Sequence, residues 1–400
     1  MNVILFEKDR ENFFPLSFTR PISSFRVGIF TIKEKWEVFY KDVSVKTEDY
    51  LSKKFPINLQ KENLWINSSI LPNHDLYTEI YSLRSGECLI KGNNIIAFIS
   101  CDDIYEKLNK IESHSQFDMI NHLWDIFSLN GKEIESDLNL IKEGFLMPEK
   151  FSNTILHHNK KSLSVCKSNK IIGDYHIFIA KGANVKCSIL NATDGPIYIG
   201  EDAEVMEGSL IRGPFAMCNN SVLKMGSKIY GSTTIGPFCK VGGEINNSVF
   251  FGYSSKAHDG FLGNSVIGEW CNLGADTNNS NLKNNYENVK IWDYKKEGFI
   301  NTGLQFCGLI MADHSKCGIN TMFNTGTVVG VSANIFDSGF VRNFVPSFSW
   351  GGKSGFKTYK INKVFEVATA VMNRRNIVFS DVEKSILEKV FELTSKYRNY

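Results

Sequence analysis

The sequence predicts an α/β domain at the N-terminus, a parallel β-helix in the middle of the chain and two helices at the C-terminus. The strongest observation is an aliphatic residue at every sixth position: Ile199, Val205, Ile211, Met217, Leu223, Ile229, Ile235 and Val241. Neither the 3.6-residue period of a helix nor the two-residue period of a strand places these side chains on one face. In a parallel β-helix each hexad forms one flat face of a triangular coil, and stacked coils bury the repeated residue in one continuous core.

The period continues beyond Val241 after a change of phase. Two further runs are predicted to point inward: Val249, Phe261, Ile267 and Leu273, and then Met311, Cys317, Phe323, Val329, Ile335 and Val341. The segment 278–303 between these runs is Asn-rich and out of phase. An insertion in a solenoid is normally a loop that leaves one corner, often on the binding face. We therefore expect functional residues between Gly242 and Gly303.

Residues 1–160 lack the six-residue period and alternate between strand and helix patterns. Apolar runs predict buried strands at 2–6, 64–67 and 88–100. Residues 22–40 are expected to end in a short helix, and 118–127 has helical spacing. This alternation predicts an α/β layer.

The period stops after the third run. Residues 361–400 predict two helices around a break near Ser380, with Asp381 as the N-cap of the second helix. The predicted domains are therefore an α/β domain at 1–160, a β-helix at 161–345 and an extension with two helices at 346–400.

The composition narrows the class of protein. A chain of 400 residues exceeds one ordinary core, which favours two domains. The net charge of +2 gives no electrostatic reason to propose nucleic acid or a membrane surface as a partner, and no apolar run approaches the roughly 20 residues of a membrane span. The N-terminus lacks the features of a signal peptide. The cysteines form no Cys-x-x-Cys pair, so we expect reduced thiols and a cytoplasmic protein.

Two stretches of the coil carry a family resemblance. Residues 255–263 read Ser-Lys-Ala-His-Asp-Gly-Phe-Leu-Gly, and residues 272–277 read Asn-Leu-Gly-Ala-Asp-Thr. They resemble the acetyltransferase signature of the GlmU family of N-acetylglucosamine-1-phosphate uridyltransferases and glucosamine-1-phosphate acetyltransferases. The chain is more similar to a divergent, Bacteroidetes-type form, with which it shares Pro-Leu-Ser-Phe-Thr-Arg-Pro at 15–21 and Phe-Ser-Trp-Gly-Gly at 348–352. The resemblance implies a reduced nucleotidyltransferase-like α/β domain followed by a left-handed β-helix of hexapeptide repeats.

The resemblance also implies roles for residues of the coil. His258 would be the general base that takes a proton from the sugar amine, and Glu244 would orient its imidazole. Asn246 stands where the family has a lysine that binds the sugar phosphate, and Phe261 where it has a tyrosine that bonds the sugar. The remaining residues expected in the sugar-phosphate and acyl pockets are Asn272, Asn281, Asn285, Tyr286 and Lys290.

The N-terminal domain departs further from the family. Sugar nucleotidyltransferases begin with a Gly-rich turn that approaches the nucleotide phosphates, whereas residues 5–9 here read Leu-Phe-Glu-Lys-Asp. Arg20 takes the place of the usual lysine after this turn. We expect four cations to clamp the pyrophosphate: Arg20, Arg26, Lys33 and Lys35. Asp102 and Asp103 form a carboxylate pair that would suit Mg²⁺ or would cap a helix.

Each candidate also has a structural interpretation. A histidine such as His258 is often a corner residue of a coil, and a solvated corner explains His314. The Asn run at 278–288 fits either a binding loop or a ladder of amides along the coil. The arginines fit surface salt bridges.

Together these observations predict a cytoplasmic enzyme that transfers an acetyl group from acetyl-CoA to glucosamine 1-phosphate. It would then use UTP to make UDP-N-acetylglucosamine. Uridylyl transfer would need Mg²⁺, for which no ligand is assigned, and the coil is expected to form a homotrimer. Two alternatives remain: nucleotidyl transfer alone, with the coil as an oligomerisation and regulatory scaffold, and a purely structural coil without enzymatic activity.

Overall fold

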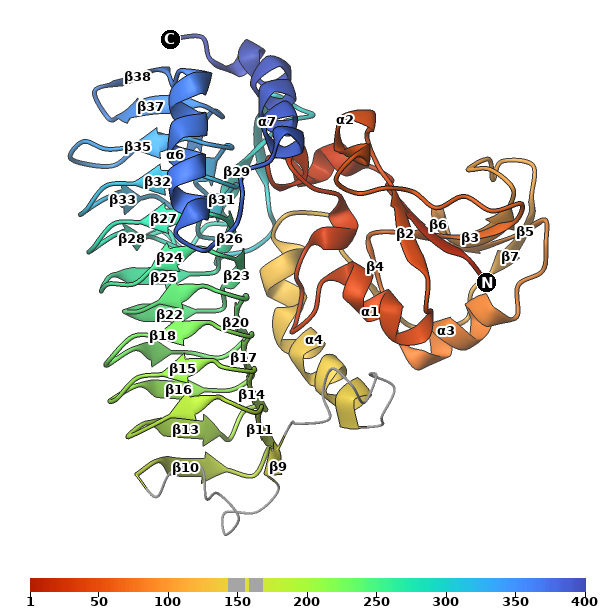
Figure 1. The fold of residues 1–400 in the computed structure, drawn as a ribbon, viewed down its shortest axis with the longest axis horizontal. Coiled ribbons are helices and arrows are strands. Elements are labelled where there is room, and N and C mark those ends of the chain that lie inside the picture. Colours follow the sequence, from red (N-terminus) through yellow and green to blue (C-terminus); the bar gives the residue numbers. More distant parts are fainter. Residues whose placement is uncertain (143–154, 158–167) are drawn as a thin grey trace.

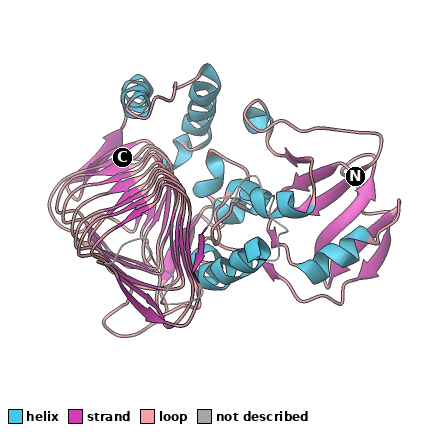
Figure 2. Cartoon of the chain, turned by 60° about the horizontal axis from the view of Figure 1, so that its bottom comes forward, coloured by secondary structure: helices cyan, strands magenta, loops and turns pink. Residues whose placement is uncertain are grey.

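The computed structural model describes residues 1–142, 155–157 and 168–400. The α/β domain lies beside an elongated coil, and helix α4 (Asp125–Lys142) lies between the two (Figure 1). In the turned view of Figure 2 the stacked coils are seen from near one end, with helices between them and the N-terminal sheet. The predicted boundary at 160 falls outside the described residues.

A mixed sheet of six strands forms the core of the α/β domain. Its order is β2-β1-β3-β6-β5-β7, and β1 pairs in parallel with both β2 and β3. The strands are β1 (Val3–Phe6), β2 (Val43–Lys46), β3 (Asn63–Asn67), β5 (Glu87–Lys91), β6 (Asn94–Ser100) and β7 (Asn109–Glu112), while β4 (Ile70–Leu71) pairs with β8 (Asp118–Met119). The helices are α1 (Ile32–Phe39), α2 (Asp49–Ser52), α3 (His74–Tyr81) and α4.

The predicted strands of this domain are present, although the run at 88–100 folds into the two strands β5 and β6. The helix predicted in 22–40 is confined to α1, which begins at a capping box between Thr31 and Glu34. The helix expected at 118–127 begins only at Asp125. Strand β8 precedes it, so the apolar spacing there spans a strand and a turn.

The coil has three faces, each a sheet of mostly parallel strands, and is a left-handed parallel β-helix. Face 1 contains β10 (Lys170–Gly173), β13 (Ile189–Ala192), β16 (Leu210–Arg212), β19 (Lys228–Ile229), β22 (Glu244–Asn246) and β25 (Phe261–Gly263). Face 2 contains β9 (Ile155–His157), β11 (Ile177–Ile179), β14 (Ile197–Ile199), β17 (Phe215–Met217), β20 (Thr233–Ile235), β23 (Val249–Gly252), β26 (Val266–Glu269), β31 (Ile310–Met311), β34 (Val328–Val329) and β36 (Phe344–Val345). Face 3 contains β12 (Asn184–Val185), β15 (Glu204–Val205), β18 (Val222–Leu223), β21 (Lys240–Val241), β24 (Ser255–Lys256), β27 (Asn272–Leu273), β32 (Lys316–Cys317), β35 (Asn334–Ile335), β37 (Ser349–Gly352) and β38 (Gly355–Thr358).

The first and third predicted runs all lie in the coil core. The second run is partly wrong, because Phe250 and Leu262 point inward instead of Val249 and Phe261. The inward-pointing residues Val241, Ile245 and Phe250 are four and five positions apart in sequence instead of six. The phase therefore changes in two steps between Val241 and Phe250, where the sequence indicated a single change between Val241 and Val249.

The insertion at 278–303 bridges the domains. Strand β28 (Asn278–Asn279) pairs with β33 (Met322–Phe323), and β29 (Lys290–Asp293) forms a hairpin with β30 (Gly298–Asn301). In this hairpin the ring of Tyr294 packs edge-on against Phe14 and Phe18 of the α/β domain. Much of the segment expected to form a binding loop is thus used to join the two domains.

The outer surface of face 2 is covered by the α/β domain. Phe178, Tyr198 and Ala216 form a buried cluster with side chains of α4 and of the loop before α1. Asn130 of α4 accepts a hydrogen bond from the Gly28 amide at 2.8 Å and donates one to the Ser232 carbonyl at 2.7 Å. The outer surface of face 2 is therefore buried within the chain along these coils.

Two helices follow the coil, α6 (Ile361–Asn373) and α7 (Asp381–Leu393). The N-cap of α7 is Ser380, whose side chain accepts a hydrogen bond from the Glu383 amide, and Asp381 is the first helical residue. Strand β37 pairs in parallel with β35, so the coil extends past the predicted end at 345. Within the described ranges, none of the helices combines the length and apolarity that crossing a membrane requires.

An aromatic ladder runs along the corner between faces 2 and 3. Phe238, Tyr253, Trp270 and His314 stack with ring centroids 5.0, 4.3 and 6.3 Å apart. The segment after α6 covers the ladder, since Phe379 packs against His314. The expectation of a solvated corner at His314 is wrong, and burial lowers the pKa of this imidazole.

Candidate active sites

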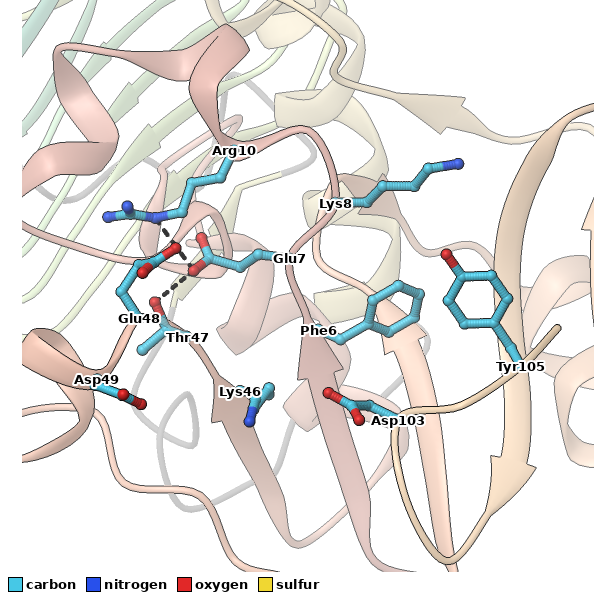
Figure 3. A pocket seen from close by; sticks show the side chains of 10 residues that line it. All are labelled: Phe6, Glu7, Lys8, Arg10, Lys46, Thr47, Glu48, Asp49, Asp103 and Tyr105. Carbon is cyan, nitrogen blue, oxygen red and sulfur yellow. Dashed lines mark hydrogen bonds and ion pairs between the residues drawn. The ribbon is translucent and has the colours of Figure 1, made fainter.

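A cavity of about 390 Å³ opens where β1 and β2 end. Strand β1 pairs in parallel with β2 on one side and with β3 on the other, so the strand order reverses at β1. Open α/β sheets bind ligands at the carboxyl ends of the strands at such a point. The lining residues come from the end of β1, the end of β2 and the loop after β6 (Figure 3): Phe6, Glu7, Lys8, Arg10, Lys46, Thr47, Glu48, Asp49, Asp103 and Tyr105.

Glu7 holds the wall of this cavity together. Its carboxylate accepts hydrogen bonds from the Ile22 amide at 2.7 Å and from the Thr47 hydroxyl, and Arg10 lies 3.3 Å away. Burial raises the pKa of Glu7 despite these partners, which favour the charged form. Arg10 is further engaged by the Ser17 carbonyl. Glu7 and Arg10 therefore hold the loop after β1 in place. Since their polar atoms are already engaged, other side chains of the cavity must bind a ligand.

The groups left for a ligand are two cations and three carboxylates. In the described part of the chain, Lys8, Lys46, Glu48, Asp49 and Asp103 line the cavity and have no ion-pair partner. The Asp102 carboxylate accepts a bond from the Ile104 amide at 3.2 Å and caps the turn, whereas Asp103 lines the cavity. The two predicted carboxylates therefore have different roles: Asp102 caps the turn, and Asp103 lines the cavity.

The predicted phosphate clamp is not brought together, because none of its four cations lines the cavity. Arg20 is buried between the domains, with Nη1 2.9 Å from Glu269 and Nη2 2.5 Å from Asp313. Thr19 donates a further hydrogen bond to Asp313 at 2.6 Å. The Pro-Leu-Ser-Phe-Thr-Arg-Pro segment thus fastens the α/β domain to the coil.

The other three predicted clamp residues have different partners. Arg26 is buried and donates to the carbonyls of Ile29 and Phe251. Lys35 is buried in ion pairs with Glu133 and Asp137 of α4. Lys33 pairs with Glu37 along the surface of α1. Each of these three cations therefore has partners within the protein, and none of them needs a bound phosphate to account for its position.

His258 is exposed at the corner between β24 of face 3 and β25 of face 1. Glu244 lies on the preceding coil, where it is in register with Phe261 and its amide donates to the Gly260 carbonyl at 3.2 Å. Among the described residues, no hydrogen bond or ion pair joins the Glu244 carboxylate to the His258 imidazole. The structure places the two residues on adjacent coils without direct contact between their side chains.

Lys256, two residues before His258, was missed by the sequence reasoning. It is 1 % exposed and lies in register with Val241, in a position that aliphatic side chains fill on earlier coils. Its ammonium donates to the carbonyls of Gly242, His258 and Gly260 at 3.2, 3.1 and 2.7 Å. The sequence does contain a signal for this residue, because Lys256 occupies a position of the repeat where the earlier coils have an inward-pointing aliphatic residue.

Three of the expected substrate-binding residues share the outer surface of face 1. Asn246 is in register with Gly263. A Cβ atom on Gly263 would lie 2.6 Å from the Phe261 ring and 2.6 Å from the Asn281 amide, so both side chains border this glycine. Asn281 also donates to Asn264 at 2.8 Å. This group lies on the coil surface next to the His258 corner.

The remaining expected residues lie elsewhere. Asn272 is exposed on face 3, in register with Ser255. The Asn285 side chain accepts from the Glu287 amide, the Tyr286 ring is exposed in the insertion, and Lys290 begins β29.

At the start of the insertion, Asn278 and Asn279 bind backbone groups of the coil, as the structural interpretation of the Asn run predicts. The Asn278 side chain accepts a hydrogen bond from the Phe261 amide at 2.7 Å. Asn279 accepts from the Gly263 amide at 2.9 Å and donates to the Gly263 carbonyl at 3.1 Å. These two side chains satisfy backbone groups that a neighbouring strand would otherwise bind.

Metal-binding groups are sparse. Across the described residues, no group of three or more His, Cys, Asp or Glu side chains could hold a metal ion, and the cysteines there are free thiols. The acidic wall of the cavity still suits Mg²⁺, which is usually bound by one or two carboxylates together with substrate phosphates.

The cavity lies in the part of the chain that a family model covers. Residues 3–145 match a family model described as sugar nucleotidyl transferase, and this match covers the whole domain that carries the cavity. The N-terminal α/β domain is therefore nucleotidyltransferase-like. A comparison with curated proteins finds no match.

The chain is also similar to solved structures, including the following two. One is a variant of AntD, an N-acyltransferase from Bacillus cereus in complex with dTDP and coenzyme A, with 10% identity over 54% of this chain and 96% of that one and a TM-score of 0.19. The other is the polysialic acid O-acetyltransferase OatWY, with 15% identity over 48% of this chain and 85% of that one and a TM-score of 0.18. Likeness at this level carries no argument about activity.

Proposed function

We propose that this protein makes UDP-N-acetylglucosamine in two steps, acetylation of glucosamine 1-phosphate by acetyl-CoA followed by uridylyl transfer from UTP. The observation that carries the proposal is the cavity at the ends of β1 and β2, which lies in the sugar nucleotidyl transferase domain and presents Lys8, Lys46 and Asp103.

In the uridylyl step, a phosphate oxygen of the sugar phosphate attacks the α-phosphorus of UTP, and pyrophosphate leaves. Lys8 and Lys46 bind the phosphate oxygens and offset the charge that develops on them. Asp103 would hold Mg²⁺, which neutralises charge on the triphosphate. The Tyr105 ring, whose centroid is 6.4 Å from that of Phe6, offers an aromatic surface beside the phosphate groups.

In the acetyl step, the amine of the sugar attacks the thioester carbon, and the coenzyme A thiol leaves. His258 takes the proton of the amine, which is the role of a general base in such a transfer. Its exposure at the corner supports this role, because a substrate can reach it. Glu244 orients the imidazole only if its side chain turns toward the corner when substrate binds.

Assembly and location belong to the same proposal. Acetyl-CoA and the sugar phosphate would bind between the coils of a homotrimer in the cytoplasm. Because face 2 is covered by the α/β domain, the contacts of that trimer would use faces 1 and 3.

Nucleotidyl transfer alone is the second candidate. It is favoured by the absence, among the described residues, of a side chain that orients His258. The match of residues 3–145 to a sugar nucleotidyl transferase model argues against a chain without any enzymatic activity.

Product analysis in two reactions tests the proposal. One contains acetyl-CoA and glucosamine 1-phosphate, and the other contains UTP, Mg²⁺ and N-acetylglucosamine 1-phosphate. Product in both supports the two-step function. Product in the second reaction alone supports nucleotidyl transfer with a scaffold coil, and product in neither contradicts both candidates.

A further inference from the structure

The core of the coil contains a charged side chain where packing requires an apolar one. Val185, Val205, Leu223 and Val241 occupy successive coils in register on the inner side of face 3, and Lys256 is next in this column. An ammonium group in such a core loses its hydration, which is costly unless other groups replace the water. Methionine would fill a similar volume without this cost, so packing alone does not explain a lysine here.

The partners of the ammonium show what it does. Two of its three carbonyl acceptors, His258 and Gly260, belong to the corner that carries the exposed imidazole. The third, Gly242, belongs to the same corner of the preceding coil. The lysine therefore ties the backbone at His258 and just after it to the coil before it.

We propose that Lys256 is a positioning residue, whose ammonium holds the corner backbone so that the His258 imidazole stands in one place on the coil surface. The role in acetyl transfer rests on the function proposed above, whereas the effect on the backbone does not. A general base must lie within hydrogen-bond reach of its proton, and a displacement of about 1 Å can cost up to roughly 100-fold in rate.

The charge of this lysine is also adjustable. Burial lowers the pKa of Lys256 to about 8, although the carboxylates of Asp259 and Asp276 and the Cys317 thiol oppose the shift. Below this pH the ammonium has three donors for the three carbonyls, and above it the amine has two. Loss of the third donor loosens the corner, so an alkaline limit to acetyl transfer follows that does not come from His258.

The first test is Lys256→Met. We expect the variant to retain the oligomer, the thermal unfolding midpoint within a few degrees and uridylyl transfer, and to lose about tenfold or more in kcat for acetyl transfer with little change in KM for acetyl-CoA. Lys316→Met is the matched control, because Lys316 is also on face 3 and donates to a corner carbonyl, that of His314, away from the His258 corner. A kcat equal to that of the control would overturn the proposal.

The second test uses the wild-type protein and no substrate. Amide hydrogen exchange at 257–260 is compared with exchange at 224–227, the same corner two coils earlier, from pH 7 to pH 10. We expect exchange at 257–260 to accelerate more than at the reference corner as the pH passes about 8. Parallel behaviour of the two corners would overturn the positioning role even if acetyl transfer proved absent, so the two failures are distinguishable.

Discussion

Arg20 Nη2 lies 2.5 Å from the Asp313 carboxylate, and this ion pair joins the α/β domain to a coil residue 293 positions away in sequence. Glu269 holds the other side of the guanidinium at 2.9 Å. A residue expected to bind phosphate thus anchors the interface between the two domains.

Replacing Arg20 by methionine should lower the free energy of unfolding by about 3–5 kcal/mol, because the buried Asp313 carboxylate and the partly buried Glu269 carboxylate lose their counter-charge. Urea unfolding measures this. Lys363→Met is the control, since it removes an exposed ion pair with Glu366 that should contribute less than about 1 kcal/mol. Equal effects of the two substitutions would show that Arg20 is not an interface anchor.

The same interface should weaken in acid. Burial alone would raise the pKa of Glu269, but the charge and hydrogen bond of Arg20 outweigh it and lower the pKa below 4.5. Since the folded value lies below the unfolded one, the stabilisation is present above pH 4.5 and is lost as the pH falls below it. Glu269→Gln should be less stable at pH 7 and lose less stability on acidification. Thermal unfolding at several pH values checks this, and a variant with the wild-type acid profile would contradict it.

Lys46→Ala should raise KM for UTP by about tenfold or more, because a charge-assisted hydrogen bond to phosphate is worth roughly 1.5–3 kcal/mol. Acetyl transfer should be unchanged. Lys41→Ala is the control, as Lys41 is exposed just before β2, at the end remote from the cavity. An unchanged KM in the Lys46 variant would exclude this lysine from the nucleotide site.

His258→Ala should lower acetyl transfer by roughly two to four orders of magnitude, the usual worth of a general base. Stability should change little, because the side chain is exposed and no inward position is altered. Uridylyl transfer by the same preparation is the internal control. Glu244→Gln should show a smaller loss, and near-normal acetyl transfer by the His258 variant would favour the scaffold role of the coil.

Light scattering should return three times the mass of one chain. The covered outer surface of face 2 leaves faces 1 and 3 to form the contacts, so cross-links placed on face 1, for example at Tyr230, should join subunits. A stable monomer with full acetyl transfer would contradict this assembly.

Much of the fold could be predicted because its signal is local and repeated. Each hexad must bury one side chain, so the residues from Ile199 to Val241 reveal the coil without knowledge of any distant contact. The prediction became wrong at Val249 and Phe261, because the inward residues after Val241 are only four and five positions apart. A change of one or two residues in a corner alters which side chain points inward, and the sequence pattern does not mark it.

The candidate sites were likewise only partly predictable from the sequence. The sequence alone determined the coil and the corner that carries His258, since a change of phase and a short motif identify them. Only the tertiary structure decided that Arg20 pairs with Asp313, that Lys8, Lys46 and Asp103 share one cavity, and that Lys256 lies in the core. The physical reason is that a charged residue can bind a ligand, a solvent molecule or an opposite charge from any part of the chain, and the choice is made by the contacts between segments distant in sequence.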